Sequence, residues 1–291
     1  MPAVSKNRLL AYSLLLVNAI LWGFSPPIIK YALNYVSPAT FLFVRYLLAS
    51  LLFFPIFLVY RAKHPYQHQP KHLLLLALLG TPLTLLPLFY GLSATTSIEA
   101  SILESTSPIF IILGSLVYLR ETVKLREWLG VFLAIAGTLL ITLSPLLQSG
   151  SINSISIKGN LLIILSDIIW AAFLVLAKRL KSDPIYLSFT SFIISIPFFL
   201  FLALKTASPL IPPAIALPSI LYMAIGGSII AFWAYQEGQK RIEASEAAIF
   251  SYLKPVFTIP LAFIWLKEPL TPLTIFSTFI IIFGVYLSEK R

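Results

Sequence analysis

The chain contains no cysteine and only three histidines. Without cysteine it can form neither a disulfide nor a thiolate metal site. The histidines, His64, His68 and His72, share one short segment in which Pro65 and Pro70 break the helix that would align their side chains. The segment therefore fits a plain wet loop better than a metal site. No metal and no cofactor are expected.

Charge is also scarce. Only 11% of the 291 residues are charged, against about 25% in soluble globular domains. Hydrophobic residues make up 58% of the chain and the mean hydropathy is +0.92, which indicates an integral membrane protein. A β-barrel would need strands of about ten residues that alternate in polarity. Runs such as 73–79 show no alternation, so we expect an all-α membrane protein.

Apolar segments long enough to cross a bilayer follow one another along nearly the whole chain. A helix needs about 20 apolar residues for this. We predict ten transmembrane helices, over residues 9–30, 38–60, 73–92, 97–118, 128–147, 159–178, 185–204, 217–237, 242–266 and 271–288. The uncharged run between Arg8 and Lys30 is long enough to span and precedes no small-residue cleavage site, so we interpret it as the first helix and not as a signal peptide.

The sequence is internally duplicated. Shifted by 147 residues, it matches itself without a gap from Gly91 and Gly238 to Gly137 and Gly284; the matches include Glu99 and Glu246, Pro108 and Pro255, and Glu121 and Glu268. Shifts of 148 and 146 align Trp22 with Trp170, Lys30 with Lys178, and Pro38 with Pro184. We predict two repeats of five helices, 1–150 and 151–291. Because five is odd, the second repeat would be inverted.

The net charge of +10 follows the predicted topology. Fifteen of the 21 lysines and arginines fall on one side of the membrane and four on the other, while Arg45 and Lys254 lie within helices. By the positive-inside rule both termini are cytoplasmic. The charge thus indicates a multi-pass protein of the cell membrane and no nucleic-acid partner.

Four ionisable side chains lie within the predicted helices: Arg45, Glu104, Asp167 and Lys254. Each costs at least about 2.5–3.5 kcal/mol at a helix centre unless it faces a polar interior or a partner. Arg45 and Glu104 have equal predicted depth and opposite sign. One interpretation is therefore structural, with Arg45 paired to Glu104 and Lys254 to Asp167. In the other they contact a substrate, and the midplane Lys254 receives an anionic group.

Helical spacing adds further candidates. Asn18 and Trp22 share a face, as do Ser251 and Lys254. Aromatic residues could wall a solute cavity; they are Tyr90, Trp170, Trp233 and Tyr252. The alternatives are hydrogen bonds between helices for the polar residues and an interfacial belt for the aromatic ones.

Prolines and glycines recur at equivalent positions. Pro108 and Pro255 free backbone carbonyls in the middle of related helices and allow kinks beside Glu104 and Lys254. Gly91 and Gly238 are expected to end related helices, either as C-terminal caps or as flexible gates.

Several short motifs occur together in a fixed order. They are Leu21 to Gly23 with Lys30, Ser37-Pro38 followed by Arg45 and Ala49, Pro108 with Leu119 to Glu121, and Pro255 with Leu266 to Glu268. In order and duplication the chain resembles the EamA-like drug/metabolite transporters. The resemblance implies ten helices in two inverted repeats and export or exchange of small metabolites, such as amino acids, through a central cavity. The second repeat departs from the pattern because Ser191 stands opposite Arg45.

The predicted function is secondary transport by alternating access, with no covalent chemistry, so the protein is not expected to be an enzyme. A carrier of cationic amines or polyamines is the alternative, and a channel or lipid scramblase a further one. Expected partners are a small-molecule substrate, the lipid bilayer and, as a candidate coupling ion, the proton. The chain would act as a monomer or weak homodimer.

Overall fold

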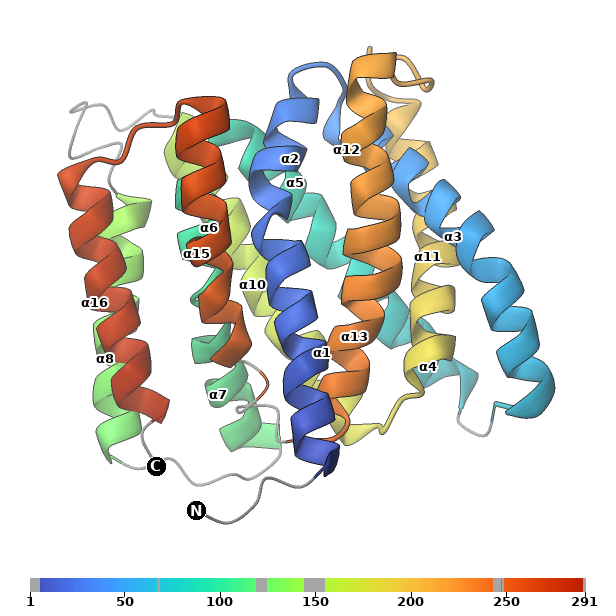
Figure 1. Ribbon diagram of the computed structural model, residues 1–291, viewed down its shortest axis with the longest axis horizontal. Helices are drawn as coiled ribbons and strands as arrows, with labels where there is room; N and C mark the ends of the chain where they lie inside the picture. The colour runs from blue at the N-terminus through green and yellow to red at the C-terminus, as the bar shows by residue number, and fades with distance from the viewer. Residues whose placement is uncertain are drawn as a thin grey trace.

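The structure is a computed structural model that describes residues 6–66, 69–118, 125–143, 155–242, 247 and 249–289. In these ranges the chain forms helices joined by short connections, and no strand. Figure 1 shows the helices as one bundle in which α1 (Lys6–Gly23) begins and α16 (Pro272–Glu289) ends at the same end.

The first half of the bundle contains eight further segments. They are α2 (Ser25–Leu33), α3 (Pro38–Lys63), α4 (Pro70–Leu78), the π-helix η1 (Leu79–Leu83), α5 (Thr84–Ala94), α6 (Ser97–Glu104), α7 (Ser107–Tyr118) and α8 (Leu125–Thr142). The second half contains α10 (Ile155–Arg179), α11 (Pro184–Ala203), η2 (Ala214–Ala216), α12 (Leu217–Tyr222), the π-helix η3 (Met223–Ile230), α13 (Ala231–Gln239), η4 (Ile249–Leu253), α15 (Lys254–Leu261) and the π-helix η5 (Ala262–Leu266).

Seven helical stretches of the described chain are long and apolar enough to cross a membrane: Lys6–Leu33, Pro38–Lys63, Pro70–Ala94, Ser97–Tyr118, Ile157–Arg179, Pro184–Ala203 and Ala214–Gln239. Three shorter apolar helices are Trp128–Ile141, Lys254–Leu266 and Pro272–Gly284. Each of the ten ranges predicted from sequence contains helix. The all-α prediction and the multi-pass membrane class are therefore confirmed.

Helix starts follow from local sequence. Ser37 precedes the proline that opens α3, and its side chain accepts the backbone N–H of Thr40. Asp183 precedes the proline that opens α11 and accepts two backbone N–H groups. A polar cap followed by proline satisfies donors that the first turn leaves free. These signals explain why the helices begin within a few residues of the predicted positions.

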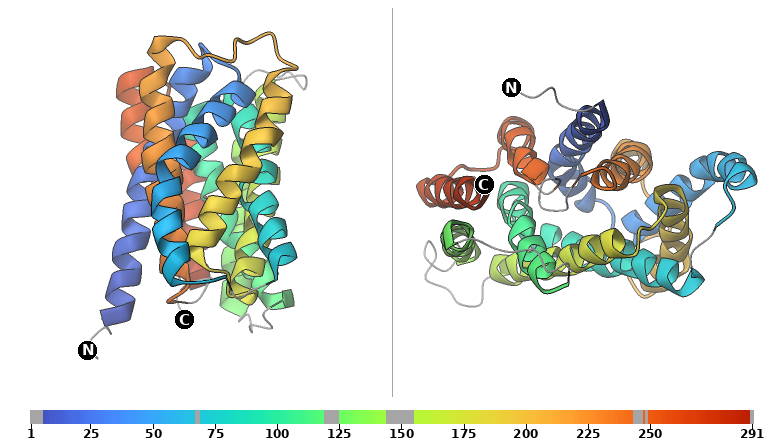
Figure 2. Two further views of the ribbon diagram at one scale, coloured as in Figure 1. Left: turned by 90° about the vertical axis from the view of Figure 1, so that its right-hand side faces the viewer. Right: turned by 90° about the horizontal axis from the view of Figure 1, so that it is seen from below.

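The main helix pairs are α3 with α11, α5 with α10, α1 with α13, and α8 with α16. Figure 2 shows the α8–α16 pair at one edge of the bundle and the α3–α11 pair at the opposite edge. Large apolar side chains cover the outer surface, for example Leu51, Val117 and Phe279, each more than 60% exposed. Such a surface is stable in lipid and not in water.

Two glycines bring helix backbones into contact. A Cβ atom on Gly91 would lie 2.7 Å from the carbonyl oxygen of Gly159, and one on Gly159 would lie 2.8 Å from that of Gly91. A Cβ on Gly238 would lie 2.8 Å from Leu15 Cγ. Neither Gly91 nor Gly238 has a left-handed backbone, so their interpretation as C-terminal caps was wrong. Both permit close helix packing; a gating role stays a prediction.

Two lysines bind the ends of helices. Lys30 Nζ donates to the carbonyls of Leu92, Ser93 and Thr95 at 2.9, 3.1 and 2.6 Å, just where α5 ends. Lys178, its mate at a shift of 148, donates to the carbonyls of Gln239 and Ile242, where α13 ends. A cation beside unpaired terminal carbonyls also stabilises the negative end of the helix dipole.

Two further contacts link the halves at equivalent positions. Asn18 Nδ2 donates to the carbonyl of Ala231 at 2.9 Å, and Ser166 Oγ donates to the carbonyl of Thr84 at 2.9 Å. Ser166 is the mate of Asn18 at a shift of 148, and Thr84 that of Ala231 at 147. The contact between α1 and α13 therefore has a counterpart, at repeat-related positions, in the contact between α10 and α5.

Glu268 caps α6 from the second half of the chain. Its carboxylate accepts the backbone N–H groups of Ser97 and Ile98 at 2.9 and 3.0 Å and the Ser97 hydroxyl at 2.9 Å. We expect Glu268→Ala to lower the free energy of unfolding by about 1–2 kcal/mol. The backbone amides at the start of α6 would lose their hydrogen-bond acceptor, and the positive end of the helix dipole would lose the negative charge beside it. Thermal unfolding in detergent measures this.

Glu237→Ala is the matched control for the Glu268 prediction. Glu237 pairs with Arg241 one turn away on a partly exposed surface, where such pairs contribute little. An equal loss of stability in both variants would contradict the capping role of Glu268.

Candidate functional site

Three helices are interrupted near the middle of the bundle. The chain breaks at Phe24 between α1 and α2, and at Ser105-Thr106 between α6 and α7. The 3₁₀ segment η4 gives way to α15 at Lys254. Pro108 lies in the first turn of α7 and Pro255 in that of α15, so each proline follows a break. The kink predicted at Pro108 is an interruption of the helix, whereas at Pro255 a 3₁₀ segment passes directly into an α-helix.

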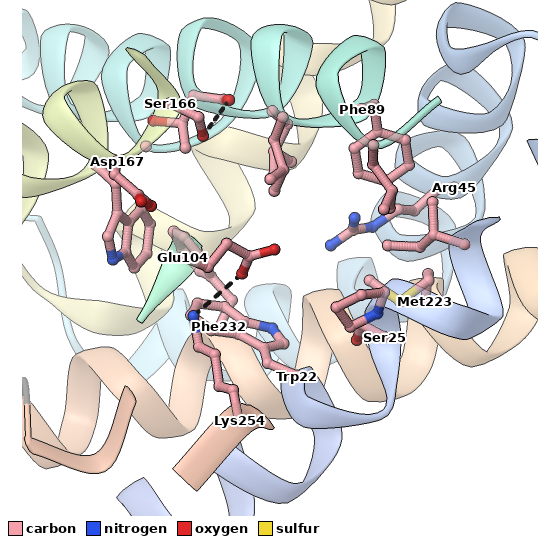
Figure 3. Close-up of a pocket in the computed structure, with 18 of the residues that line it drawn as sticks. Trp22, Ser25, Arg45, Phe89, Glu104, Ser166, Asp167, Met223, Phe232 and Lys254 are labelled. Carbon is pink, nitrogen blue, oxygen red and sulfur yellow. Dashed lines mark hydrogen bonds and ion pairs between the residues drawn. The ribbon is translucent and has the colours of Figure 1, made fainter. Parts of the chain in front are cut away.

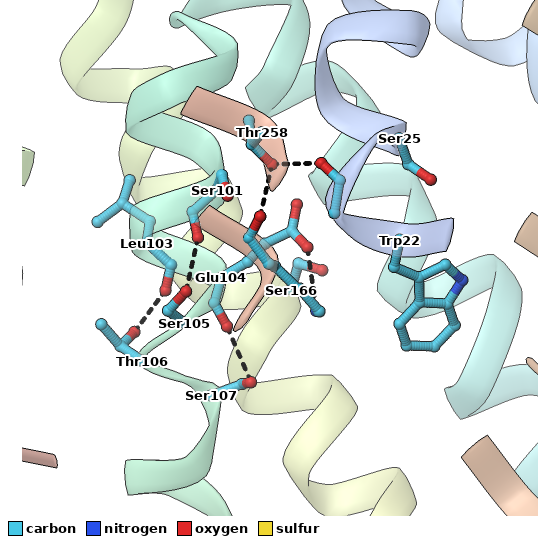
Figure 4. Close-up of polar contacts among 12 residues, drawn as sticks. Trp22, Ser25, Ser101, Leu103, Glu104, Ser105, Thr106, Ser107, Ser166 and Thr258 are labelled. Carbon is cyan, nitrogen blue, oxygen red and sulfur yellow. Dashed lines mark hydrogen bonds and ion pairs between the residues drawn. The ribbon is translucent and has the colours of Figure 1, made fainter. Parts of the chain in front are cut away.

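Hydroxyl groups bind backbone carbonyls at these interruptions (Figure 4). Thr106 Oγ1 donates to the Leu103 carbonyl at 2.7 Å, and Ser107 Oγ to the Glu104 carbonyl at 2.9 Å. Thr258 Oγ1 donates to the carbonyls of Gly23 and Lys254. The last contact joins the break at Phe24 to the start of α15, so non-helical backbone is held at this depth by protein groups.

A cavity lies beside these breaks and contains about 710 Å³ of space between atoms, counted out to its opening. It is lined from both halves of the chain (Figure 3). The lining residues are polar and charged at a few points, namely Ser25, Arg45, Thr84, Glu104, Ser166, Asp167 and Lys254. The rest of the lining is mostly apolar and aromatic. All four ionisable residues singled out in the sequence therefore meet in one cavity.

Lys254 and Glu104 form an ion pair in which Lys254 Nζ lies 3.3 Å from Glu104 Oε2. Their side chains are 6% and 14% exposed, respectively. The ammonium also lies 5.2 Å from the centre of the Trp22 ring, within cation–π range. The interpretation that pairs Glu104 with Arg45 was therefore wrong. Equal depth along two helices does not fix the direction in which the side chains point.

Arg45 uses its buried guanidinium differently. Nε donates to Ser228 Oγ at 2.7 Å, and Cζ lies 5.1 and 5.9 Å from the ring centres of Tyr46 and Phe89. In the described part of the chain Arg45 makes no ion pair. At the equivalent place in the second half, the Ser191 carbonyl accepts a hydrogen bond from Thr81. The charge of Arg45 thus has no counterpart there.

Asp167 lines the cavity and is 4% exposed. Its Oδ2 atom is fully buried and has no hydrogen-bond partner among the described residues. Its expected pairing with Lys254 was also wrong, since the ammonium lies on Glu104. A buried carboxylate oxygen without a partner is costly and marks a place where a donor would be stabilised.

The two mated tryptophans form one aromatic wall. Trp22 and Trp170 both line the cavity, with ring centres 5.4 Å apart in an edge-to-face arrangement. Trp22 Nε1 donates to the Gly227 carbonyl of η3 at 2.9 Å, which fixes the ring. Since π-helical segments leave carbonyls free for such bonds, η3 contributes to positioning this wall.

Other predicted residues lie outside the described lining of the cavity. Asn18 is buried and joins two helices, as in the structural alternative. Tyr90 is 37% exposed on α5, Trp233 is partly buried, and Ser251 is buried within η4. The side chain of Tyr252 lies outside the described residues.

Several residues that line the cavity were not predicted from the sequence. Ser166 could have been found, because it is the mate of Asn18 in the repeat. Phe89, Met223 and Phe232 also line the cavity. Their apolar side chains give no sequence signal that separates a cavity wall from lipid-facing or core positions.

The arrangement can bind a small polar solute. Side chains with charges of both signs, hydroxyl groups and aromatic rings all line the cavity. No group of three histidine, aspartate or glutamate side chains suited to a metal occurs within the described residues.

Comparisons with known proteins agree with this geometry. The sequence profile of the EamA-like transporter family matches residues 9–143 and again residues 157–289. An uncharacterized transporter of Archaeoglobus fulgidus is 32% identical over 99% of this chain and 98% of its own. The uncharacterized transporter YetK of Bacillus subtilis is 30% identical over 69% of this chain and 62% of its own. One solved crystal structure matches with a TM-score of 0.70 at 17% identity over 99% of this chain and 97% of its own, which supports the fold alone.

Proposed function

The chain belongs to the EamA-like transporter family, and on that premise we propose that it is a secondary transporter that moves a small metabolite, such as an amino acid, through its central cavity. It is a multi-pass membrane transporter and not an enzyme, with a small-molecule substrate and the lipid bilayer as partners. One observation carries the finer proposal: a cavity lined from both halves of the chain gathers four buried charges. Charges at that depth commonly mark a solute pathway.

Alternating access is the proposed mechanism. The two halves, 1–150 and 151–291, would be inverted repeats of five membrane helices each, and their rocking would expose the cavity to one side and then the other. The paired contacts of Asn18 and Ser166, and those of Lys30 and Lys178, support this proposal because each pair lies at repeat-related positions. Pro108, Pro255, Gly91 and Gly238 are candidate hinge positions.

Both termini are proposed to be cytoplasmic in the cell membrane, in keeping with the distribution of lysine and arginine. The absence of cysteine makes a direct test available. An impermeant maleimide applied to intact cells should label Lys205→Cys and leave Lys63→Cys unlabelled, since both positions are exposed in the structure. The reverse pattern would overturn the orientation.

Counterflow in proteoliposomes tests the transport proposal. Vesicles loaded with each unlabelled solute of a panel of amino acids, amines and sugar phosphates are diluted into the labelled solute. A carrier should accumulate label transiently and saturate with concentration. Flux that does not saturate, or conductance near the diffusion limit, would indicate a channel instead. Counterflow restricted to amines would favour the cation carrier, for which Asp167 and the tryptophans supply the relevant chemistry.

Proton coupling is the proposal for the energy source, because Glu104 lies in the cavity and a carboxylate can carry a proton. Transport driven by an imposed pH gradient measures it. If Glu104→Gln protein responded to the gradient as the parent does, Glu104 would not be the proton carrier.

A further inference from the structure

The four charges of the cavity differ in what they contact. The charges of Lys254 and Glu104 compensate each other, because Lys254 Nζ lies 3.3 Å from Glu104 Oε2. Arg45 makes no ion pair in the described part of the chain, and its recorded hydrogen bond uses only Nε. Asp167 keeps one buried oxygen without a partner among the described residues. One positive and one negative group are therefore left for a ligand.

These two groups lie on opposite sides of the cavity. In Figure 3 Arg45 and Asp167 point inward from opposite sides, and Glu104 lies between them. Arg45 comes from α3 in the first half and Asp167 from α10 in the second. Aromatic and aliphatic side chains complete the lining, among them Trp22, Trp170 and Leu88. A ligand that reaches both charges must pass Glu104 and its partner Lys254, along a wall that is otherwise mostly apolar and aromatic.

We propose that the cavity binds a zwitterion whose anionic and cationic groups stand at its two ends, joined by an apolar stem. This rests on the proposed transport function and names its substrate class. The anionic end binds Arg45, whose Nη groups can donate two parallel hydrogen bonds to a carboxylate. The cationic end donates to the Asp167 carboxylate, and the stem lies against the aromatic wall.

Charge balance favours this ligand over a simple ion. The four side chains sum to zero, so a neutral zwitterion adds no net charge to a buried space. An anion alone would leave Asp167 without a cationic partner, and a cation alone would leave Arg45 without an anionic one. Buried charges left in this way are strongly unfavourable. A compact zwitterion with both charges beside one carbon would meet only one end.

Binding to the purified full chain in detergent tests the proposal, with tryptophan fluorescence as the signal because Trp22 and Trp170 line the cavity. The probes are δ-aminovalerate, which carries a charge at each end, valerate, pentylamine and glycine. We expect δ-aminovalerate to bind at least about tenfold more tightly than each of the other three, since each lacks one charged contact. Equal affinity of valerate, pentylamine or glycine would overturn the proposal.

Two variants assign the ends. Arg45→Gln should weaken the binding of δ-aminovalerate and valerate at least about tenfold and leave the binding of pentylamine unchanged. Asp167→Asn should weaken the binding of δ-aminovalerate and pentylamine at least about tenfold and leave the binding of valerate unchanged. Ser191→Ala is the matched control, because Ser191 is buried at the place equivalent to Arg45 and does not line the described cavity. Arg45→Lys and Asp167→Glu should restore part of the affinity. A uniform loss for all probes in a variant that melts at the parent temperature would refute the assignment.

Comparison with counterflow separates this proposal from the transport function. If δ-aminovalerate binds but shows no counterflow, the ligand class stands and transport fails for it. If another solute shows counterflow that δ-aminovalerate does not inhibit, the transport function stands and the ligand class is wrong. If none of the four probes binds, the ligand class is also wrong.

Discussion

Lys254→Met is expected to lower the free energy of unfolding by about 3–5 kcal/mol and to abolish counterflow. The reason is that Glu104 then stays buried without its partner, and an uncompensated buried charge costs about that much. Glu104→Gln should also be destabilising, because the buried ammonium of Lys254 loses its ion-pair partner and keeps the Trp22 ring beside it. Thermal and denaturant unfolding in detergent give the stability.

The double variant Glu104→Gln with Lys254→Met provides the decisive comparison. With both charges removed, stability should return to within about 1–2 kcal/mol of the parent, since replacing a buried pair is often nearly neutral. Transport should not return, because the pair lines the cavity. If the two single losses simply added in the double variant, the residues would not be coupled and the pair would have no structural role.

Gly91→Ala is expected to destabilise the protein by about 1–3 kcal/mol, although alanine favours helices. Its Cβ would lie 2.7 Å from the Gly159 carbonyl oxygen, and a backbone atom cannot move aside as a flexible side chain can. The α5 and α10 backbones would have to separate, and the Ser166 to Thr84 hydrogen bond between them would lengthen. Thermal unfolding in detergent measures the loss.

Gly226→Ala is the control for this comparison. Its Cβ would meet Leu21 Cδ2 at 3.5 Å, an ordinary contact. We therefore expect a change within about 0.5 kcal/mol, as for substitutions that create no clash. If Gly226→Ala were as harmful as Gly91→Ala, loss of backbone freedom and not helix contact would explain both.

Much of the helical architecture could be predicted because its determinants are local or periodic. Composition fixed the membrane class, and caps such as Ser37 and Asp183 fixed where helices begin. The shift of 147 residues also anticipated which positions would be related, although it did not reveal their contacts. The pairing of Asn18 with Ala231 joins residues 213 apart, and a single sequence carries no record of such a partner.

The sequence predicted which charged residues lie in the site better than it predicted how they pair. All four buried charges were identified, because an ionisable residue in an apolar helix needs a reason. Their pairing was wrong because the break at Ser105-Thr106 ends α6 at Glu104 and changes its surroundings. Gly91 was misjudged for a different reason. Glycine occurs both at helix C-terminal caps and where two helix backbones pack closely, and the sequence does not distinguish the two roles.

The three interruptions around the cavity divide its wall into two tiers. In the upper tier of Figure 1, α2, α6 and α15 contact one another; in the lower tier, η4 contacts both α1 and α7. Each tier is thus a cluster of short helical segments joined to the other by the backbone at Phe24, Ser105-Thr106 and Leu253. In the proposed alternating access, the upper segments would separate while the lower segments stay together, and then the reverse. A solute in the cavity would then meet one opening at a time.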